Sequence, residues 1–228
     1  QARRRGESPE QVLRARAAFD PDALTIGFAR RFATYKRAPL IFRDPQRLHR
    51  ILADAKRPVQ IVFAGKAHPR DRDGQAYAAE VHRWTRENGF EGRVALVEEY
   101  DMHVGRMLVS GCDVWLNNPL RPHEASGTSG MKPPMHGGLN LSILDGWWPE
   151  CYDGTNGWAI GDGSENPDTE VQNAADAESL YSLLENEVVP EFYDLGPSGL
   201  PERWIRRALR SATTVPAVFN TDRMVGEY

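Results

Sequence analysis

The chain has 228 residues, of which 40% are hydrophobic and 26% are charged, a balance typical of a globular protein with a sizeable core. Its formal net charge of −4 argues against a nucleic-acid-binding protein, which usually carries an excess of basic residues. No apolar run approaches the roughly 20 residues that a membrane span needs, and no secretory signal opens the chain, so we expect no membrane association.

The chain begins with a charged segment, residues 1–20, for which we predict a helical lead-in to a single domain over residues 21–228. Short apolar runs then predict buried strands at 24–29, 59–64, 94–97, 113–116 and 139–143. Helical spacing of apolar residues predicts helices at 36–54, 74–88, 103–110, 176–189 and 200–212. The Gly-, Asp-, Asn- and Trp-rich stretch 145–174 has no clear period and predicts a long surface loop.

Strands that alternate with helices indicate βαβ units and a parallel sheet covered on both faces. The predicted fold class is therefore α/β, with a Rossmann-like, doubly wound sheet. In such sheets ligands bind outside the carboxyl ends of the strands, so the segments that follow the strands are the candidates for chemistry. Cys112 and Cys151 have no metal-ligand spacing, and we expect two free thiols, no metal and a reducing, cytoplasmic environment.

The segment after the first strand, Arg30–Arg37, holds four cations within eight residues. Cations in a loop that leads into a helix make a good phosphate site, because the helix amino end adds positive potential. A solvated basic helix start is the alternative, and the position directly after a strand favours phosphate.

A second candidate follows the fourth strand, at residues 122–132, where small residues from Ala125 to Gly130 would let the backbone approach a ligand closely. A helix is expected to begin near Ser129, which places Lys132 about one turn inside it. A lysine buried near such a positive helix end has a lowered pKa and is primed to form a Schiff base. The pattern is that of a phosphate-binding loop, although a Ser/Gly-rich loop with a surface lysine would look the same.

The segment Glu124-Ala125-Ser126-Gly127-Thr128, followed four residues later by Lys132, resembles the pyridoxal phosphate segment of the α-glucan (glycogen, maltodextrin or starch) phosphorylases. Other segments resemble the same family in the same order along the chain. They are Arg30 to Arg37, Gly65 to Pro69, Glu98-Glu99-Tyr100 and Leu144-Asp145-Gly146. The resemblance implies the C-terminal half of a glycosyltransferase architecture with two Rossmann-like domains.

The resemblance implies that Lys132 carries pyridoxal 5′-phosphate as a covalent aldimine. Thr128 and Ser129, together with Arg30, would bind the phosphate of this cofactor. Tyr100 would pack beside the cofactor ring.

For the substrates, the resemblance implies that Arg31 and Lys36 hold inorganic phosphate, and that Glu124 and Gly127 contact hydroxyls of the transferred glucose. Lys132, Arg31 and Lys36 would thus be the catalytic residues. The implied reaction is phosphorolysis of the terminal α-1,4 bond of a glucan, with retention, to give α-glucose 1-phosphate. The polymer-binding first domain would be missing, so we expect the chain alone to have little or no activity, and a homo-oligomer stays open.

The sequence departs from the animal-type pattern at Ala33-Thr34, Asp101 and Ser129-Gly130, and Pro133-Pro134 resembles the compact bacterial branch. These differences leave the glucan chain length and the regulation undetermined. Two other functions stay open. A nucleotide-sugar-dependent glucan synthase would share the architecture without a lysine aldimine, and a non-catalytic phosphate- or glucan-binding module would bind without a covalent cofactor.

Overall fold

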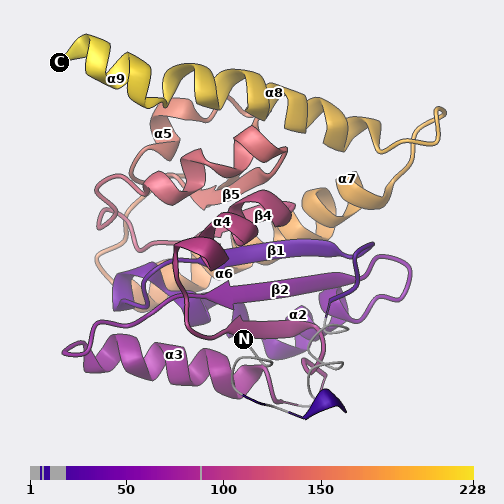
Figure 1. Ribbon diagram of the computed structural model, residues 1–228, viewed down its shortest axis with the longest axis vertical. Coiled ribbons are helices and arrows are strands. Elements are labelled where there is room, and N and C mark those ends of the chain that lie inside the picture. The colour runs from indigo at the N-terminus through magenta and orange to yellow at the C-terminus, as the bar shows by residue number, and fades with distance from the viewer. Residues whose placement is uncertain (1–5, 7, 11–18, 88) are drawn as a thin grey trace.

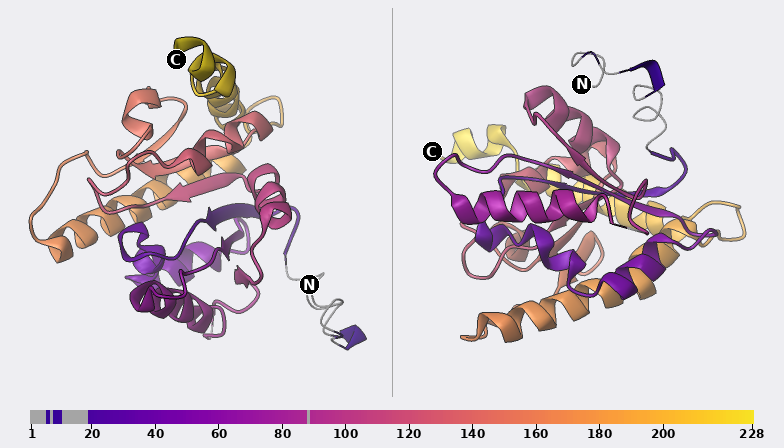
Figure 2. Two further views of the ribbon diagram at one scale, coloured as in Figure 1. Left: turned by 60° about the vertical axis from the view of Figure 1, so that its left-hand side comes forward. Right: turned by 90° about the horizontal axis from the view of Figure 1, so that it is seen from below.

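A computed structural model describes residues 6, 8–10, 19–87 and 89–228 (Figure 1). Most of the predicted helical lead-in over residues 1–20 therefore lies outside the described residues. The remainder forms one twisted sheet with helices on its two faces, as the two views of Figure 2 show.

The sheet has six strands in the order β3-β2-β1-β4-β5-β6, and all neighbours pair in parallel. This order places the first strand in the interior and winds the chain outward in both directions, which confirms the doubly wound α/β fold. The strands are β1 (Leu24–Ala29), β2 (Val59–Ala64), β3 (Val94–Val97), β4 (Val114–Asn117), β5 (Leu139–Ile143) and β6 (Gly157–Ile160).

Helices connect the strands and cover the sheet. The α-helices are α2 (Pro45–Leu52), α3 (Arg72–Trp84), α4 (Met102–Gly111), α5 (Trp148–Cys151), α6 (Thr169–Leu183), α7 (Val189–Tyr193), α8 (Glu202–Val218) and α9 (Thr221–Glu227). Short 3-10 helices are η1 (Thr34–Lys36), η2 (Ala38–Phe42), η3 (Thr128–Met131) and η4 (Pro133–His136), and η5 (Leu184–Val188) is a π-helical turn.

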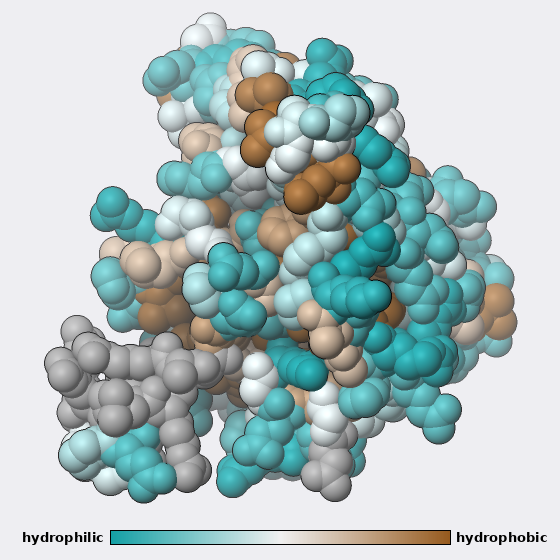
Figure 3. Space-filling model, turned by 90° about the vertical axis from the view of Figure 1, so that its right-hand side faces the viewer, coloured by the Kyte–Doolittle hydropathy of each residue, from teal (hydrophilic) through white to brown (hydrophobic). Residues whose placement is uncertain are grey.

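The core is built from the strands, because nearly every residue of β1, β2, β4 and β5 is buried. The side of the molecule shown in Figure 3 is mainly polar, with hydrophobic residues in small separate patches. Cys112 is buried against Trp115, and burial raises the pKa of its thiol to about 12. Cys112 and Cys151 are both free.

The long loop predicted at 145–174 is wrong in part, because it contains α5 and the edge strand β6. β6 is only four residues long and includes Gly157 and Ala159, so it lacks the apolar run that marks the other strands. Its pairing with β5 and the burial of Trp158, which is 1% exposed, hold it in the sheet. A Cβ at position 157 would lie 2.7 Å from the carbonyl oxygen of Asn140, so the strand can approach β5 only with glycine there.

The helix predicted at 36–54 is two helices, η2 and α2. The break falls at Asp44, whose carboxylate accepts a hydrogen bond from the amide of Arg47, and Pro45 occupies the first turn of α2. The helix predicted at 176–189 begins earlier, at Thr169, and the helix predicted at 200–212 runs from Glu202 on to Val218. Asp168 caps α6, and α9 was not predicted.

Among the described residues, no helix combines the length and the apolarity that crossing a bilayer requires. In the same part of the chain, no group of three or more His, Cys, Asp or Glu side chains is placed to hold a metal ion.

Candidate functional site

The segments that follow β1, β2, β4 and β5 meet at the carboxyl edge of the sheet. Arg30 follows β1, Gly65 follows β2, and the amide of Arg30 donates to the carbonyl of Ala64 at 3.1 Å. The segment after β4 crosses above them, where the amide of Leu120 donates to the carbonyl of Tyr35 at 2.6 Å. The parallel strands thus bring together the basic segment 30–37 and the Gly/Ser-rich segment 122–132 that were identified from the sequence.

The centre of this edge is a buried ionic cluster of Arg30, Lys36 and Glu124. Arg30 Nη2 donates to Glu124 Oε2 at 2.7 Å, and Lys36 Nζ contacts the same oxygen. The three side chains are only 6%, 8% and 8% exposed. Burial lowers the pKa of the Arg30 guanidinium, and the Glu124 carboxylate opposes that shift. One carboxylate therefore pairs with two cations, and the cluster keeps a net positive charge.

Arg30 retains hydrogen-bonding capacity beyond this ion pair. Its Nε and Nη1 atoms are buried and have no hydrogen-bond partner among the described residues. Buried donors of a charged group are costly to leave unpaired. An added Cβ at Gly127, which has a φ of +80°, would lie 3.3 Å from Glu124 Cγ and 3.7 Å from Arg30 Nη2. The backbone of the loop therefore passes directly over the cluster, an arrangement that suits an anion.

The turn after β5 fixes the loop that carries Glu124. Asp145 Oδ2 accepts a hydrogen bond from the backbone amide of Glu124 at 2.9 Å, and the amide of Trp147 donates to the carbonyl of Ser126 at 2.9 Å. A Cβ at Gly146 would lie 2.3 Å from that same Ser126 oxygen, so the close contact requires glycine. The family resemblance marked Asp145, but its function as an anchor for Glu124 was not predicted.

Arg37, one of the four cations of the candidate phosphate segment, joins the two loops, a role that was not predicted. It is a buried non-glycine residue with a φ of +50°, between η1 and η2. Its Nε and Nη2 donate to the carbonyls of Asn118 and Pro119 at 2.9 and 2.7 Å, and Asn118 Nδ2 donates back to the Arg37 carbonyl at 2.9 Å. Arg37 also contacts α6, through an ion pair of 2.8 Å to Asp176 and a hydrogen bond from Nη1 to Asn173 Oδ1 at 2.9 Å. Burial lowers the pKa of Arg37, and Asp176 opposes that shift.

Lys132 differs from its prediction. The side chain is exposed, and its Nζ donates to the carbonyl of Thr128 at 3.4 Å. It lies between η3 and η4 rather than inside an α-helix. A continuous α-helix from Ser129 would need amides at positions 133 and 134, and both are prolines. The predicted burial of Lys132 at a helix amino end is therefore wrong for the chain as described.

The other predicted site residues lie around the loop 122–132 and differ in how far they are buried. Trp115 Nε1 donates to Ser129 Oγ at 3.5 Å, and Thr128 is exposed. Tyr100 packs against the apolar cluster that contains Trp115, where burial raises the pKa of its phenol. Arg31 is exposed and makes no hydrogen bond or ion pair with any described residue, so it stands apart from the buried cluster.

Curated relatives match nearly the whole chain. It is 52% identical over 209 residues to maltodextrin phosphorylase of Thermococcus litoralis, a match that covers 92% of this chain and 24% of the relative. It is 46% identical to glycogen phosphorylase of Mycobacterium bovis, covering 98% of this chain and 26% of the relative. It is 49% identical to glycogen phosphorylase of Aquifex aeolicus, covering 95% and 31%. The chain is homologous to one segment of the glycogen and maltodextrin phosphorylases.

The chain spans only 24% to 31% of the length of these phosphorylases. No protein-family model matches it. A solved structure of Anabaena Alr3699/HepE in complex with UDP and glucose has a TM-score of 0.62 with this phosphorylase-like segment, at 16% identity. That match covers 96% of this chain and 52% of the other, so the same fold forms about half of a larger protein.

In this phosphorylase-like segment the backbone of Arg30 lies against Gly65, and a substitution at Gly65 tests how closely the two are packed. A Cβ at Gly65, which has a φ of +155°, would lie 2.0 Å from the carbonyl oxygen of Arg30. We expect Gly65→Ala to lower the free energy of unfolding by about 2–3 kcal/mol, measured by urea denaturation, because backbone would have to move. Gly92→Ala is the control, since Gly92 has a φ of +76° and an added Cβ there would meet no atom of the described residues within 4 Å. It should cost only about 1 kcal/mol, and equal losses would contradict the close packing.

Proposed function

We propose that this chain is the C-terminal, Rossmann-like domain, over residues 21–228, of an α-glucan phosphorylase. The proposed reaction is phosphorolysis of terminal α-1,4-glucosidic bonds by inorganic phosphate to give α-glucose 1-phosphate. The observation that carries the proposal is the buried cluster of Arg30, Lys36 and Glu124 under the Gly127 loop, in a chain homologous to phosphorylases. A cytoplasmic location and a glucan-binding domain elsewhere in the enzyme are part of the same proposal.

The proposed chemistry requires two phosphate groups, one of the substrate and one of the cofactor, held close together. Their repulsion has to be offset by clustered cations in a site of low dielectric constant. The stabilisation required is on the order of several kcal/mol. The positive excess of the cluster and the two Arg30 nitrogens that have no partner in the described part of the chain support such a site. Lys36 and the exposed Arg31 would bind the substrate phosphate, and Arg30 would bind the phosphate of the cofactor.

In this proposal Glu124 also binds the sugar, besides pairing with the two cations. Its carboxylate is an acceptor for sugar hydroxyl groups, and Asp145 fixes its backbone. With the Gly127 amide beside it, Glu124 would orient the transferred glucose toward the phosphate that Lys36 holds. Because Lys36 and Arg30 share one oxygen of Glu124, the positions of phosphate and sugar are coupled through this carboxylate.

The residues present fit pyridoxal 5′-phosphate. The exposed amine of Lys132 is available for covalent attachment, Thr128 and Ser129 carry hydroxyl groups in the same loop, and Arg30 has buried donors without a partner among the described residues. When bound, the cofactor would supply a phosphate group for proton exchange with the substrate phosphate. Tyr100 and Trp115 would form the apolar wall beside it.

Reductive trapping tests this proposal. After incubation with pyridoxal 5′-phosphate and reduction with borohydride, we expect a pyridoxyl adduct on Lys132, together with loss of the absorbance band of the protonated Schiff base. The expected result follows because a Schiff base forms with an accessible amine and is stabilised by anion-binding groups nearby. Peptide mapping by mass spectrometry identifies the modified lysine among Lys36, Lys56, Lys66 and Lys132.

Two variants control this measurement. Lys132→Arg should remove the adduct, whereas Lys56→Arg, at an exposed position outside the loops of the site, should leave it unchanged. Equal labelling of Lys56, Lys66 and Lys132 would contradict a cofactor site. It would favour a glucan synthase or a binding module that needs no covalent cofactor.

A further inference from the structure

An arginine-lined pocket lies far from the carboxyl edge of the sheet. Four arginines, Arg203, Arg206, Arg207 and Arg210, line an open pocket of about 630 Å³ beside α8, together with Thr155. Their spacing of three and four residues places them on one face of the helix. The pocket adjoins the amino end of β6, because Arg207 Nη1 donates to the carbonyl of Gly157, the first residue of that strand, at 2.8 Å. Since all strands are parallel, this is the edge opposite the candidate site.

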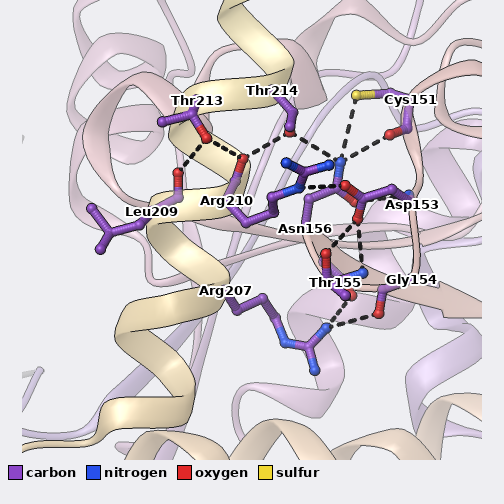
Figure 4. Close-up of polar contacts among 11 residues, drawn as sticks. Cys151, Asp153, Gly154, Thr155, Asn156, Arg207, Leu209, Arg210, Thr213 and Thr214 are labelled. Atoms are coloured by element: carbon purple, nitrogen blue, oxygen red, sulfur yellow. Dashed lines mark hydrogen bonds and ion pairs between the residues drawn. The ribbon is translucent and has the colours of Figure 1, made fainter.

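Arg207 forms the fixed base of the pocket. Its Nε and Nη2 donate to the two oxygens of the buried Glu191 at 2.9 and 2.8 Å, and its guanidinium lies 4.5 Å from the centre of the Trp158 ring. Figure 4 shows Arg207 and Arg210 extending from α8 toward the segment that contains Asp153, Gly154 and Thr155. A bidentate pair of this kind holds the guanidinium in one orientation.

The pocket carries more positive than negative charge. Glu191 accepts from both Arg203 and Arg207, and Asp153 accepts from Arg210 at 2.7 Å. The four guanidiniums that line the pocket, three of which pair with these two carboxylates, therefore leave an excess of two positive charges. Glu191 is only 2% exposed and already shared, so it cannot neutralise a further arginine.

The excess is accessible from solvent. The side chains of Arg203 and Arg210 are 56% and 54% exposed, and each uses one nitrogen atom in its ion pair. Arg206 lines the same pocket and has no hydrogen bond or ion pair with any described residue. Several guanidinium N–H groups in the pocket therefore have no acceptor among the described residues, and Thr155 also lines the pocket.

We propose that this pocket is a second anion site that binds a dianionic phosphoryl group, as inorganic phosphate or as a sugar phosphate ester. Two negative charges match the excess of two positive charges, and planar guanidiniums recognise phosphoryl oxygens by paired hydrogen bonds. The site is independent of the proposed phosphorylase function, because it shares no residue with the carboxyl edge. A phosphate compound bound in this pocket would therefore stabilise the domain without occupying the reaction site.

Nuclear magnetic resonance of the ¹⁵N-labelled chain tests the site. Inorganic phosphate and glucose 1-phosphate are titrated separately at constant ionic strength, and the amide shifts of Gly154 and Thr155 are followed. We expect saturable shifts with both ligands, weakened about tenfold or more by Arg206→Gln combined with Arg210→Gln, because charge-assisted hydrogen bonds are lost. Tighter binding of glucose 1-phosphate would identify a sugar ester as the ligand, and equal binding would identify the phosphoryl group alone.

Two further variants make the result specific. Arg50→Gln, an exposed arginine on α2, should leave the shifts unchanged, and so should Lys36→Met at the carboxyl edge. The spectrum itself reports whether each variant is folded, and Arg206→Gln alone is the reserve variant because that side chain has no partner to lose among the described residues. Linear shifts without saturation, unchanged binding in the double variant, or shifts that vanish in Lys36→Met would each overturn the proposal.

Discussion

Replacing Glu124 with alanine is expected to lower the free energy of unfolding by about 3–5 kcal/mol, because it leaves Arg30 and Lys36 buried without their shared counter-ion. Both cations are less than 10% exposed, at 6% and 8%, so water cannot replace the carboxylate without rearrangement of the loop. Urea denaturation followed by tryptophan fluorescence measures the change. Because a domain of this size loses about 2–4 °C for each kcal/mol, a clear fall in the melting temperature should accompany it.

Glu91→Ala is the matched control, since Glu91 is an exposed glutamate for which the structure shows no ion pair among the described residues. It should change stability by no more than about 0.5 kcal/mol. Glu124→Gln should fall between the two, because the amide keeps one acceptor but loses the charge. Similar effects of Glu124→Ala and Glu91→Ala would show that the cluster does not depend on its carboxylate.

Replacing Arg37 with methionine is expected to cost a similar amount, about 3–5 kcal/mol. The substitution leaves Asp176, which is 2% exposed, without its cation and removes the donors to the carbonyls of Asn118 and Pro119. Both loops of the candidate site would lose their common anchor. Phosphate binding at the carboxyl edge should therefore weaken together with stability, which a phosphate titration of the variant would detect.

Arg43→Met provides the comparison within the same segment. Arg43 also pairs with α6, through Glu170 at 2.9 Å, but the two side chains are 37% and 73% exposed. Exposed pairs contribute only about 0–1 kcal/mol, so this variant should be almost as stable as the parent chain. If Arg37→Met were no more destabilising than Arg43→Met, the two loops would not depend on the buried anchor.

The sheet was predictable because its strands are short apolar runs that are buried on both faces. Leu24–Ala29 and Val59–Ala64 are each continuous in sequence and almost wholly buried in the structure. β6 escaped prediction because Gly157 and Ala159 give it no such run, and its place depends on β5 and on Trp158. When a strand is stabilised mainly by contacts with its neighbours, its own residues do not show a strand pattern.

The candidate site was predictable where it follows strand ends, as at Arg30, Lys36 and Glu124. The fold places both segments at one edge of the sheet, but the pairing of both cations with one oxygen of Glu124 was not predicted. The ion pair of Arg37 with Asp176 could not be predicted either, because it joins a loop to a distant helix and nothing in the sequence pairs this cation with Asp176. The burial predicted for Lys132 assumed an α-helix that Pro133 and Pro134 prevent.

Phosphate-dependent stability measures the central claim, that the Arg30–Lys36–Glu124 cluster is a phosphate site. Melting curves are compared with and without phosphate at constant ionic strength for the parent chain, Glu124→Gln and Lys36→Met, all carrying Arg206→Gln and Arg210→Gln to remove the pocket beside α8. At about ten times its dissociation constant, phosphate should add about 1.4 kcal/mol to the free energy of unfolding of the parent chain. The gain should be larger for Glu124→Gln, which lacks the competing carboxylate, and smaller for Lys36→Met, whereas equal gains in all three proteins would contradict the claim.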